Sequence, residues 1–356
     1  MKALRFHARR DLRVEEVPAP EGLGPKDVLL RNSFVGICGT DLHEYLAGPI
    51  FIPTKPHPRT GAKAPQILGH EYSGRVIAIG AEVTMVRPGD RVSVQPLVAP
   101  PDDYFTRRGL GQLANGLALV GLSWAWGGMG EMSVVREENV AVLPDNVSSE
   151  QGAMIEPAAV VVHAVDKGRV AAGHSVLVTG AGPIGALACL AASAAGATTI
   201  LVSEIDPKRR ERIRELGVVT EVFEPGTPEA ARAIAAHTEG GFGVDVALEC
   251  VGHEKALGTC IESVRRRGTI VQVGLLVQPG LVDISSLVTK DITLEGSWCY
   301  ETTMWPRVIG LVASGKLPVE RVVSARIGLD DAVRGGFDVL TAPGSGAMKI
   351  LIQTSD

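Results

Sequence analysis

Hydrophobic and polar positions follow two different patterns along the chain, and the change comes near residue 155. Before it, short runs rich in β-branched residues are separated by Gly, Pro and Asp, as in Arg87-Pro88-Gly89-Asp90. Short strands at this spacing predict an irregular β-barrel-like domain. The strands expected there cover residues 27–31, 73–79, 91–94 and 131–135.

From about residue 173, continuous apolar runs alternate with helical segments, which predicts a parallel sheet covered on both faces. Buried strands are expected at 175–179, 199–203, 244–249 and 269–273, and helices at 183–195, 206–216 and 254–266. Asp206 and Pro207 suit the N-cap and first position of the second helix, which Gly217 ends. The basic run 265–267 is interpreted as the cationic end of the third helix.

After residue 296 the pattern loosens again. A helix at 305–314 and a final strand at 347–353 are expected to return to the first domain. The predicted fold class is α/β, with a doubly wound parallel-sheet domain at 157–296. A β-barrel domain at 1–156, completed by 297–356, would precede and follow it.

A glycine-rich turn joins the first buried strand of the parallel sheet to its helix. In Gly180-Ala181-Gly182-Pro183-Ile184-Gly185, Gly180 permits the tight turn, Gly182 lets the backbone approach a pyrophosphate, and Gly185 allows close helix–sheet packing. The helix N-terminus adds free N–H groups for phosphate. In this strand–turn–helix context the motif predicts a Rossmann dinucleotide site that includes Pro183 and Ile184.

Glu204 ends the second buried strand, about 20 residues after the glycines, where a carboxylate can bind the adenosine ribose. It would repel a 2′-phosphate by roughly 4 kcal/mol at 4 Å and an effective dielectric near 20. NAD is therefore preferred over NADP, although Arg209 is a residue type that can accommodate the phosphate. Val273, at the end of another strand, is assigned to the same cofactor site.

Zinc is bound in proteins by thiolate, imidazole and carboxylate groups, and a catalytic site uses three of them. Cys38, His70 and Glu156 could supply such a set. Each residue alone also suits a different role, since a single Cys is usually a small buried hydrophobe and a single His an ordinary core or surface residue. Spacing alone leaves both interpretations open.

The motifs in this order resemble the zinc-containing medium-chain alcohol dehydrogenase family over nearly the whole chain. They are Gly36-Ile37-Cys38-Gly39-Thr40-Asp41-Leu42-His43, Gly69-His70-Glu71, Glu156-Pro157 and the glycine-rich turn. The stretches 41–45 and 48–53 are similar to the 2,3-butanediol dehydrogenase branch, with sorbitol and threonine dehydrogenases as relatives. The resemblance implies a GroES-like catalytic domain beside the Rossmann domain. It also implies one catalytic zinc, NAD, and oxidation of a small secondary alcohol through a zinc alkoxide and hydride transfer.

The resemblance also implies roles for single residues. Cys38 and His70 would hold zinc with Glu156 as the favoured third ligand and Glu71 as its alternate, and Asp41 would orient His70.

The Thr40 hydroxyl would touch the alcohol oxygen, and His43 would take the proton onward through the cofactor ribose to solvent, because the pKa of an imidazole is near neutral pH. Thr40 would also suit a helix N-cap. Lys349 matches a basic residue near the cofactor pyrophosphate, with a surface lysine as the alternative. Trp124, Trp126, Trp298 and Tyr300 are candidates to line the cleft between domains.

The chain departs from most relatives between residues 95 and 115. That lobe contains no Cys, so it cannot hold the Cys-bound structural zinc that the resemblance would otherwise imply. Packing of Tyr104, Phe105 and Leu110 is expected to hold the lobe instead.

Composition narrows the other possibilities. A net charge of −5 gives no basic face for nucleic acid, and no apolar run is long enough for a membrane span. The N-terminus has no apolar signal segment and the five Cys are scattered, so a cytoplasmic enzyme acting on a small-molecule diol is expected, as a homodimer or homotetramer. A sorbitol-type polyol or threonine dehydrogenase, or a zinc-free quinone reductase, are the alternatives.

Overall fold

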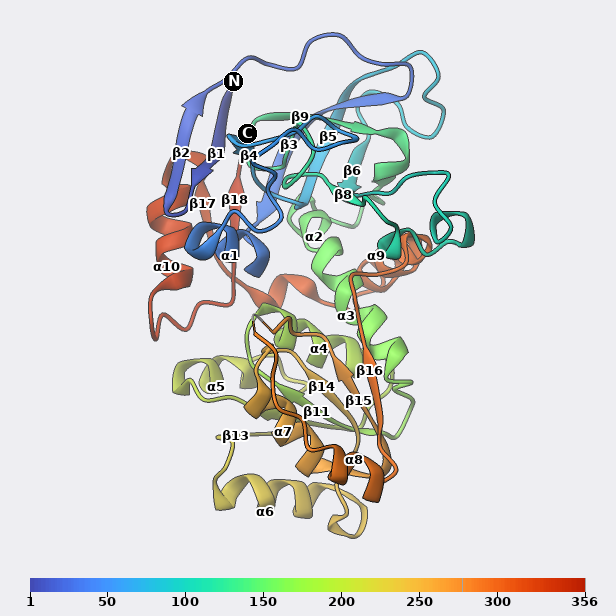
Figure 1. Cartoon of the computed structure of the whole chain (residues 1–356), viewed down its shortest axis with the longest axis vertical. Helices are drawn as coiled ribbons and strands as arrows, with labels where there is room; N and C mark the ends of the chain where they lie inside the picture. Colours follow the sequence, from blue (N-terminus) through green and yellow to red (C-terminus); the bar gives the residue numbers. More distant parts are fainter. Residues whose placement is uncertain (277, 356) are drawn as a thin grey trace.

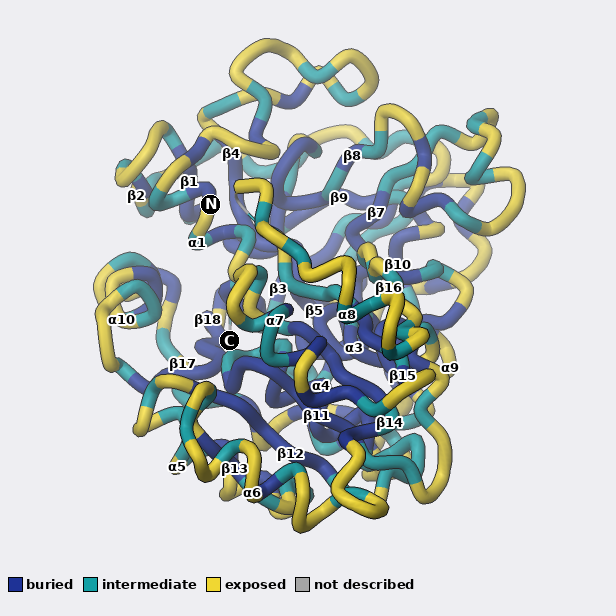
Figure 2. The backbone as a smooth tube through the Cα atoms, turned by 60° about the horizontal axis from the view of Figure 1, so that its bottom comes forward, coloured by how far each residue is buried: buried dark blue, intermediate teal, exposed yellow. Residues whose placement is uncertain are grey.

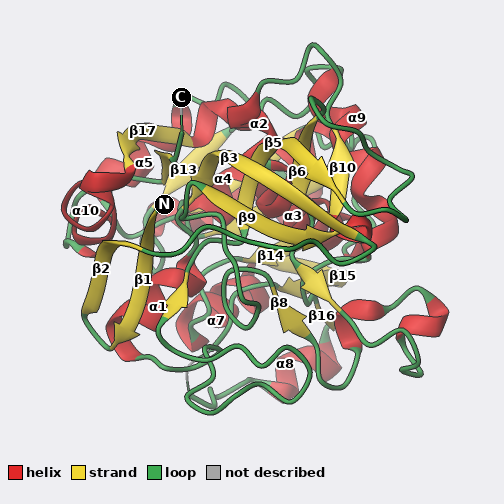
Figure 3. Ribbon diagram, turned by 90° about the horizontal axis from the view of Figure 1, so that it is seen from above, coloured by secondary structure: helices red, strands yellow, loops and turns green. Residues whose placement is uncertain are grey.

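The computed structural model describes residues 1–276 and 278–355, which fold into two lobes (Figure 1). The main sheet of the first lobe has the order β10-β6-β5-β3-β18-β17, with β9 also paired to β3. Its strands are β3 (Asp27–Gly36), β5 (Glu71–Ile79), β6 (Arg91–Val94), β9 (Met132–Arg136), β10 (Val140–Val142), β17 (Val323–Gly328) and β18 (Lys349–Gln353). Seen from above, the arrows of β3, β5, β6 and β10 lie side by side (Figure 3).

The end of the chain returns to the first lobe, as the sequence predicts. Strand β18 pairs antiparallel with β3 and parallel with β17, and the red C-terminal strands accordingly lie beside blue ones in Figure 1. Smaller sheets complete this lobe. They are formed by β1 (Lys2–Ala8), β2 (Asp11–Glu16) and β4 (Gln66–Ile67), and by β7 (Leu97–Val98) with β8 (Ala118–Leu119).

The second lobe contains the predicted parallel sheet, in the order β13-β12-β11-β14-β15-β16. Its strands are β11 (Ser175–Thr179), β12 (Thr199–Ser203), β13 (Glu221–Phe223), β14 (Val244–Glu249), β15 (Val264–Gln272) and β16 (Thr293–Gly296), each parallel to its neighbours. This order is that of a Rossmann domain, whose ligands bind at the carboxyl ends of the strands. The domain limits at 156 and 296 stay a prediction.

The helices cover the sheets and join the lobes. They are α1 (Gly39–Ala47), α2 (Ser149–Ala153), α3 (Ile155–Lys167), α4 (Pro183–Ala194), α5 (Pro207–Arg214), α6 (Pro228–His237), α7 (Glu254–Ser263), α8 (Ile284–Thr289), α9 (Trp305–Ala313) and α10 (Asp338–Thr341). The buried tube runs through α3, α4, β11 and β14 in Figure 2, where one apolar cluster joins α3, α4 and α9 to the parallel sheet. A second cluster fills the barrel.

The predicted helical end at 265–267 is wrong. Helix α7 ends at Ser263, and β15 takes in the whole basic run. Val264 and Ile270 are buried against β14, while the Arg266 and Arg267 side chains point to solvent, so a strand can bury its apolar residues and leave the cations hydrated. Strand pairing therefore outweighs the cationic pattern.

Candidate active site

A cleft of about 1410 Å³ lies between the two lobes and is lined by residues of both. One wall contains Cys38, His70 and Glu71, and the other contains Gly180 and Glu204. The sequence-predicted metal and cofactor residues therefore face the same space.

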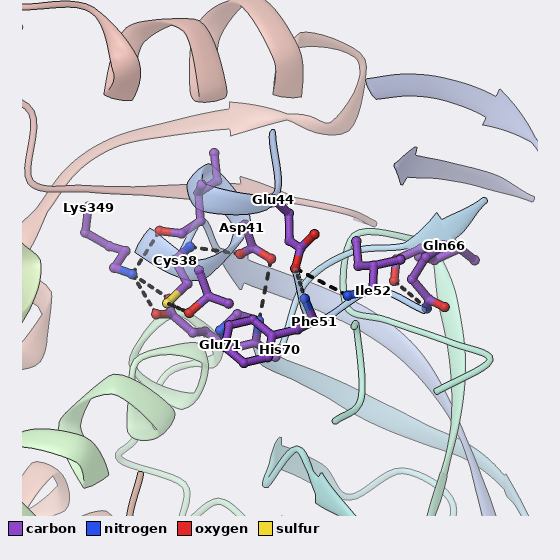
Figure 4. A network of polar contacts seen from close by, with 12 residues as sticks. Cys38, Asp41, Glu44, Phe51, Ile52, Gln66, His70, Glu71 and Lys349 are labelled. Atoms are coloured by element: carbon purple, nitrogen blue, oxygen red, sulfur yellow. Dashed lines mark hydrogen bonds and ion pairs between the residues drawn. The ribbon is translucent and has the colours of Figure 1, made fainter. Parts of the chain in front are cut away.

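The first wall brings a thiol, an imidazole and a carboxylate together. Cys38 is the N-cap of α1, directly after β3, and Glu71 begins β5, which is paired with β3 through Gly36 and Glu71. Ligand atoms of Cys38, His70 and Glu71 lie within 4.8 Å of one another (Figure 4). This donor set suits zinc, and these three residues could hold it.

Asp41 lies beside both Cys38 and His70. Its Oδ2 accepts a hydrogen bond from the Cys38 N–H at 2.9 Å, and its Oδ1 lies 3.5 Å from His70 Nδ1. A carboxylate on the Nδ1 side of His70 would leave Nε2 for a metal, as the sequence analysis expects. Burial opposes charging of this imidazole, but the Asp41 and Cys38 charges outweigh it and hold the pKa of His70 well above its ordinary value.

Lys349 is buried beside Glu71, so a surface position for this lysine is wrong. Its ammonium donates to both Glu71 carboxylate oxygens, at 2.8 and 2.6 Å, and to the Ile37 carbonyl at 3.0 Å. The two side chains are 1% and 0% exposed. Burial lowers the pKa of Lys349, but the Glu71 charge outweighs burial and the net shift is upward. The pair neutralises a carboxylate that would otherwise be buried alone.

Glu156, which the sequence analysis favours as the third ligand, lies in the first turn of α3 and lines the cleft. It is not part of the three-residue group, and its Oε1 accepts a hydrogen bond from the buried Tyr300 hydroxyl at 2.8 Å. Burial raises the pKa of Glu156 to about 7, with His70 opposing and Glu71 adding to the shift. A carboxyl with this pKa can accept or release a proton near neutral pH.

Cys299 is a cleft residue that the sequence analysis missed. It has a positive φ of 48°, which is uncommon for a residue with a side chain. Burial, followed by the Glu156 charge, raises the pKa of its thiol to about 12. Nothing in the local sequence indicates this conformation.

Thr40 and His43 both line the cleft from α1. Thr40 Oγ1 lies 3.8 Å from Cys38 Sγ, and His43, three residues further along the helix, is exposed. The interpretation of Thr40 as an N-cap is wrong, because α1 begins at Gly39 and Cys38 occupies the cap. Residues three apart share a helix face, so the hydroxyl and the imidazole lie on the same side of α1. Their role in moving a proton stays a prediction.

The second wall is formed by the glycine-rich turn after β11. Gly180 has φ +89°, and a Cβ on Gly185 would collide with the Gly180 carbonyl oxygen. Gly182 is the N-cap of α4 and Pro183 its first residue, as expected. Gly180, Gly182, Pro183 and Ile184 line the cleft. The N–H groups of Gly180 and Ala181 donate to the Ser203 carbonyl and the Glu204 carboxylate, so the start of α4, from Gly182 onward, is the part that could bind phosphate.

Glu204 follows β12 and braces the glycine turn. Its carboxylate accepts hydrogen bonds from the Ala181 N–H at 2.6 Å and the Asp206 N–H at 2.8 Å, and it is 6% exposed. Asp206 caps α5 as predicted. Arg209 also lines the cleft, and its buried Nε has no hydrogen-bond partner among the described residues.

Glu249 is a further residue that the sequence analysis did not single out. Its buried carboxylate accepts from the N–H groups of Val251 and Gly252, at 2.9 and 3.0 Å, and its carbonyl accepts from Val273. It therefore holds two loops that line the cleft, including the predicted cofactor residue Val273. The sequence does contain an indication of this role, because Glu249 ends an apolar run and directly precedes Cys250-Val251-Gly252.

The cysteine-free lobe is held by hydrogen bonds as well as by packing. The Asp103 carboxylate accepts from the N–H groups of Phe105, at 2.8 Å, and Asn115, at 3.3 Å. Tyr104, expected to pack inside, is 60% exposed and lies under the Arg108 guanidinium. A carboxylate can tie backbone segments together because it accepts several hydrogen bonds at once.

Trp298 links this lobe to the cleft, since its Nε1 donates to the Gln112 carbonyl at 3.1 Å. Of the four predicted aromatic residues, all in the described part of the chain, Trp298 lines the cleft and Trp124, Trp126 and Tyr300 do not. Trp124 instead donates to the Val134 carbonyl, and Tyr300 is fully buried.

Comparisons with known proteins match both lobes. Residues 24–145 match the alcohol dehydrogenase GroES-like domain, and residues 183–314 match the zinc-binding dehydrogenase family. The (R,R)-butanediol dehydrogenase of Bacillus subtilis (strain 168) is 38% identical over 354 residues, 99% of each chain. The chain belongs to the zinc-binding alcohol dehydrogenase family. It is therefore an alcohol oxidoreductase with a GroES-like and a Rossmann domain.

Other members of the zinc-binding alcohol dehydrogenase family are also similar. The sorbitol dehydrogenase of Homo sapiens is 35% identical over 337 residues, which cover 93% of this chain and 90% of that protein. The crystal structure of 2R,3R-butanediol dehydrogenase from Bacillus subtilis superposes with a TM-score of 0.92, at 37% identity over 99% of each chain.

Among the described residues of the present chain, no helix has the length and apolar character needed to cross a membrane.

Proposed function

We propose that this dehydrogenase oxidises a secondary hydroxyl of a small vicinal diol, such as 2,3-butanediol, with NAD and one catalytic zinc. The observation that carries the proposal is the convergence of Cys38, His70 and Glu71 ligand atoms on the cleft that the glycine turn also lines. The similarity to butanediol dehydrogenases over the full chain supports the diol.

Cys38, His70 and Glu71 are the proposed ligands in this conformation. Ligand atoms of Glu71 lie within the group and those of Glu156 do not, so the geometry supports Glu71 over the Glu156 that the sequence analysis favours. Both carboxylates also accept hydrogen bonds, Glu71 from Lys349 and Glu156 from Tyr300. Glu156 is then the alternate carboxylate, facing the same space. When bound, the zinc would lower the pKa of a hydroxyl group and NAD would accept a hydride.

The protein's own residues place the alcohol and move its proton. Thr40 offers a hydroxyl next to Cys38, and His43, three residues further along α1, is exposed and lines the same cleft. We infer that the alcohol proton passes from the Thr40 hydroxyl to the His43 imidazole. The Glu156 carboxylate is available to hold the second hydroxyl of a diol, because Tyr300 donates to its Oε1 and leaves Oε2 as a further acceptor.

The apolar part of the cleft lining favours a short, mostly apolar substrate. Phe51, Leu97, Leu119, Leu122 and Trp298 belong to that lining. A polyol would bring hydroxyl groups that find no partner on these side chains, and each unpaired buried hydroxyl costs about 1–3 kcal/mol. This lining supports a diol over a sorbitol-type polyol.

Glu204 supports NAD over NADP, because a buried carboxylate beside the ribose site would repel a 2′-phosphate. A homo-oligomeric, cytoplasmic enzyme completes the proposal, and size-exclusion chromatography with light scattering would test the oligomer.

The decisive experiment compares vicinal diols, sorbitol-type polyols and threonine as substrates with NAD and with NADP, while zinc content is measured on the same preparation. The proposal expects one zinc per chain and the highest kcat/KM for a four-carbon diol with NAD. A zinc-free preparation with full activity would refute the metal centre, and a preference for sorbitol would refute the diol.

A further inference from the structure

Glu44 is a fully buried carboxylate in the last turn of α1, one residue after His43. Its oxygens accept hydrogen bonds from three successive backbone N–H groups, those of Ile50, at 2.9 Å, Phe51, at 2.5 Å, and Ile52, at 3.3 Å. Figure 4 shows Glu44 extending from α1 toward the segment with Phe51 and Ile52. One side chain therefore ties the helix to the segment 48–52, here called the Phe51 loop.

The Phe51 loop is held at both ends. At its start, the Gly48 N–H donates to the Glu44 carbonyl at 2.8 Å, and at its end Ile52 is 2% exposed in the barrel core. Between these anchors Phe51 is 38% exposed and lines the same cleft as Cys38 and Thr40. The position of the aromatic ring in the cleft thus depends on the backbone that Glu44 holds.

The chemistry of Glu44 indicates that holding the loop is its role. In the described residues no Lys, Arg or His forms an ion pair with it, so its charge is compensated by the loop N–H groups. Burying an unpaired charge is costly unless hydrogen bonds stabilise it. A buried carboxylate without these three donors would destabilise the fold.

We propose that Glu44 is a positioning residue that fixes the Phe51 loop, and that Phe51 is the wall that limits the carbon-chain length of the alcohol. The wall proposal rests on the proposed function. Helix α1 then carries both the inferred proton route, at Thr40 and His43, and the support of the specificity wall. The same helix would therefore influence both the carbon-chain length that the enzyme accepts and the removal of the alcohol proton.

The first test measures amide hydrogen exchange at residues 50–52 in the full-length enzyme by mass spectrometry. Glu44→Gln keeps the side-chain size but removes the charge and turns an amide NH₂ toward the loop donors. Exchange there should become at least about tenfold faster, since several hydrogen bonds of about 1 kcal/mol each are weakened. Unchanged protection would overturn the positioning role.

Glu137→Gln is the matched control. Glu137 is also buried and accepts hydrogen bonds from two backbone N–H groups, those of Thr84 and Met85, in a loop that does not line the cleft. This variant should expose residues 84 and 85 to exchange and leave residues 50–52 protected. A general loss of protection in both variants would show that Glu44 acts only on overall stability.

The second test compares kcat/KM for vicinal diols of four, five and six carbons. Phe51→Ala should shift the preference from four toward six carbons by about tenfold, the discrimination that a methylene group commonly provides. Glu44→Gln should shift it in the same direction, while the KM for NAD and the zinc content stay unchanged. Glu137→Gln should leave the preference as in the wild type.

The outcomes separate the two proposals. If Glu44→Gln and Phe51→Ala kept the wild-type chain-length preference, the wall would be wrong even with the diol activity intact. If the wild-type enzyme oxidised no vicinal diol, the proposed function would fail, whereas the exchange measurement would still uphold or overturn the positioning role of Glu44.

Discussion

The glycine turn on one wall of the cleft is a continuous stretch, 180–185, whereas the cluster on the other wall joins Cys38, His70, Glu71 and Lys349 from distant parts of the chain. The turn acts through backbone geometry, with Gly180 at positive φ and a helix N-terminus behind it. The cluster acts through buried charges that neutralise one another. Local conformation forms the wall with the glycine turn, and long-range packing forms the wall with Cys38, His70 and Glu71.

The largest effect is expected when a proposed metal ligand is removed from the wall that contains Cys38, His70 and Glu71. Cys38→Ser should lower kcat/KM by at least about 10⁴-fold with loss of zinc, because bound zinc lowers a hydroxyl pKa by up to about 9 units. Steady-state kinetics and metal analysis would check it. Cys189→Ala, a buried thiol on α4 outside the cleft, should keep both zinc and turnover. A Cys38→Ser enzyme that retained wild-type activity would contradict the metal centre.

A change in the buried ion pair between Lys349 and Glu71 tests whether charge pairing stabilises the wall that contains Cys38, His70 and Glu71. Lys349→Met should reduce the free energy of unfolding by about 3–5 kcal/mol, because Glu71 would be buried without its cation. Urea unfolding in the presence of a chelator would measure it, since no metal could then neutralise Glu71. The double variant Lys349→Met/Glu71→Gln should recover part of the loss. Equal losses in the single and double variants would show that lysine packing, not charge, is decisive.

A substitution of Glu204 tests coenzyme preference at the wall that the glycine turn forms. Glu204→Gln should lower the ratio of kcat/KM for NAD to that for NADP by about a hundredfold, because the repulsion of a 2′-phosphate is removed. Initial rates with each coenzyme would show this. Glu221→Gln, at a half-exposed position on β13 outside the cleft, should leave the ratio unchanged. If the ratio did not change in Glu204→Gln, residues other than Glu204 would determine the preference for NAD over NADP.

The smallest expected effect is the pH-dependent contribution of Asp245, in the parallel sheet, to the free energy of unfolding. Burial raises the pKa of Asp245, but hydrogen bonds from the Ser175 N–H and Arg265 outweigh burial and leave the pKa below its ordinary 3.8. The folded state therefore favours the charged form, so its stabilisation is present at neutral pH and is lost as pH falls below about 3.8.

Asp245→Asn should lower the unfolding free energy by about 1 kcal/mol at pH 7 and much less at low pH. Urea titrations at several pH values would measure the difference. Asp291→Asn, at a side chain 82% exposed in the same lobe, should have no comparable effect at either pH. A loss that stayed constant with pH would rule out the charge as its source.

Several elements follow directly from sequence patterns. The strand–turn–helix at 175–194 and the cap at Asp206 form as predicted, because apolar runs, glycines and capping residues act within a few positions. The basic run 265–267 was misassigned, because the pairing of its flanking residues Val264 and Thr269 with β14 lies outside any local window. Asp103, Glu249 and Glu44 were missed because a carboxylate shows its backbone partners only once loops meet.

The sequence by itself determined the alternation of buried strands and helices in the parallel-sheet lobe, the glycine turn and the residue types available for a metal, because these depend on neighbours along the chain. Only the tertiary structure decided that Glu71 and not Glu156 joins Cys38 and His70, and that Lys349 is buried against it. The physical reason is that burial and charge pairing depend on distance in space. The β3–β5 pairing sets the place of Glu71, and β18, paired with β3, brings Lys349 to it.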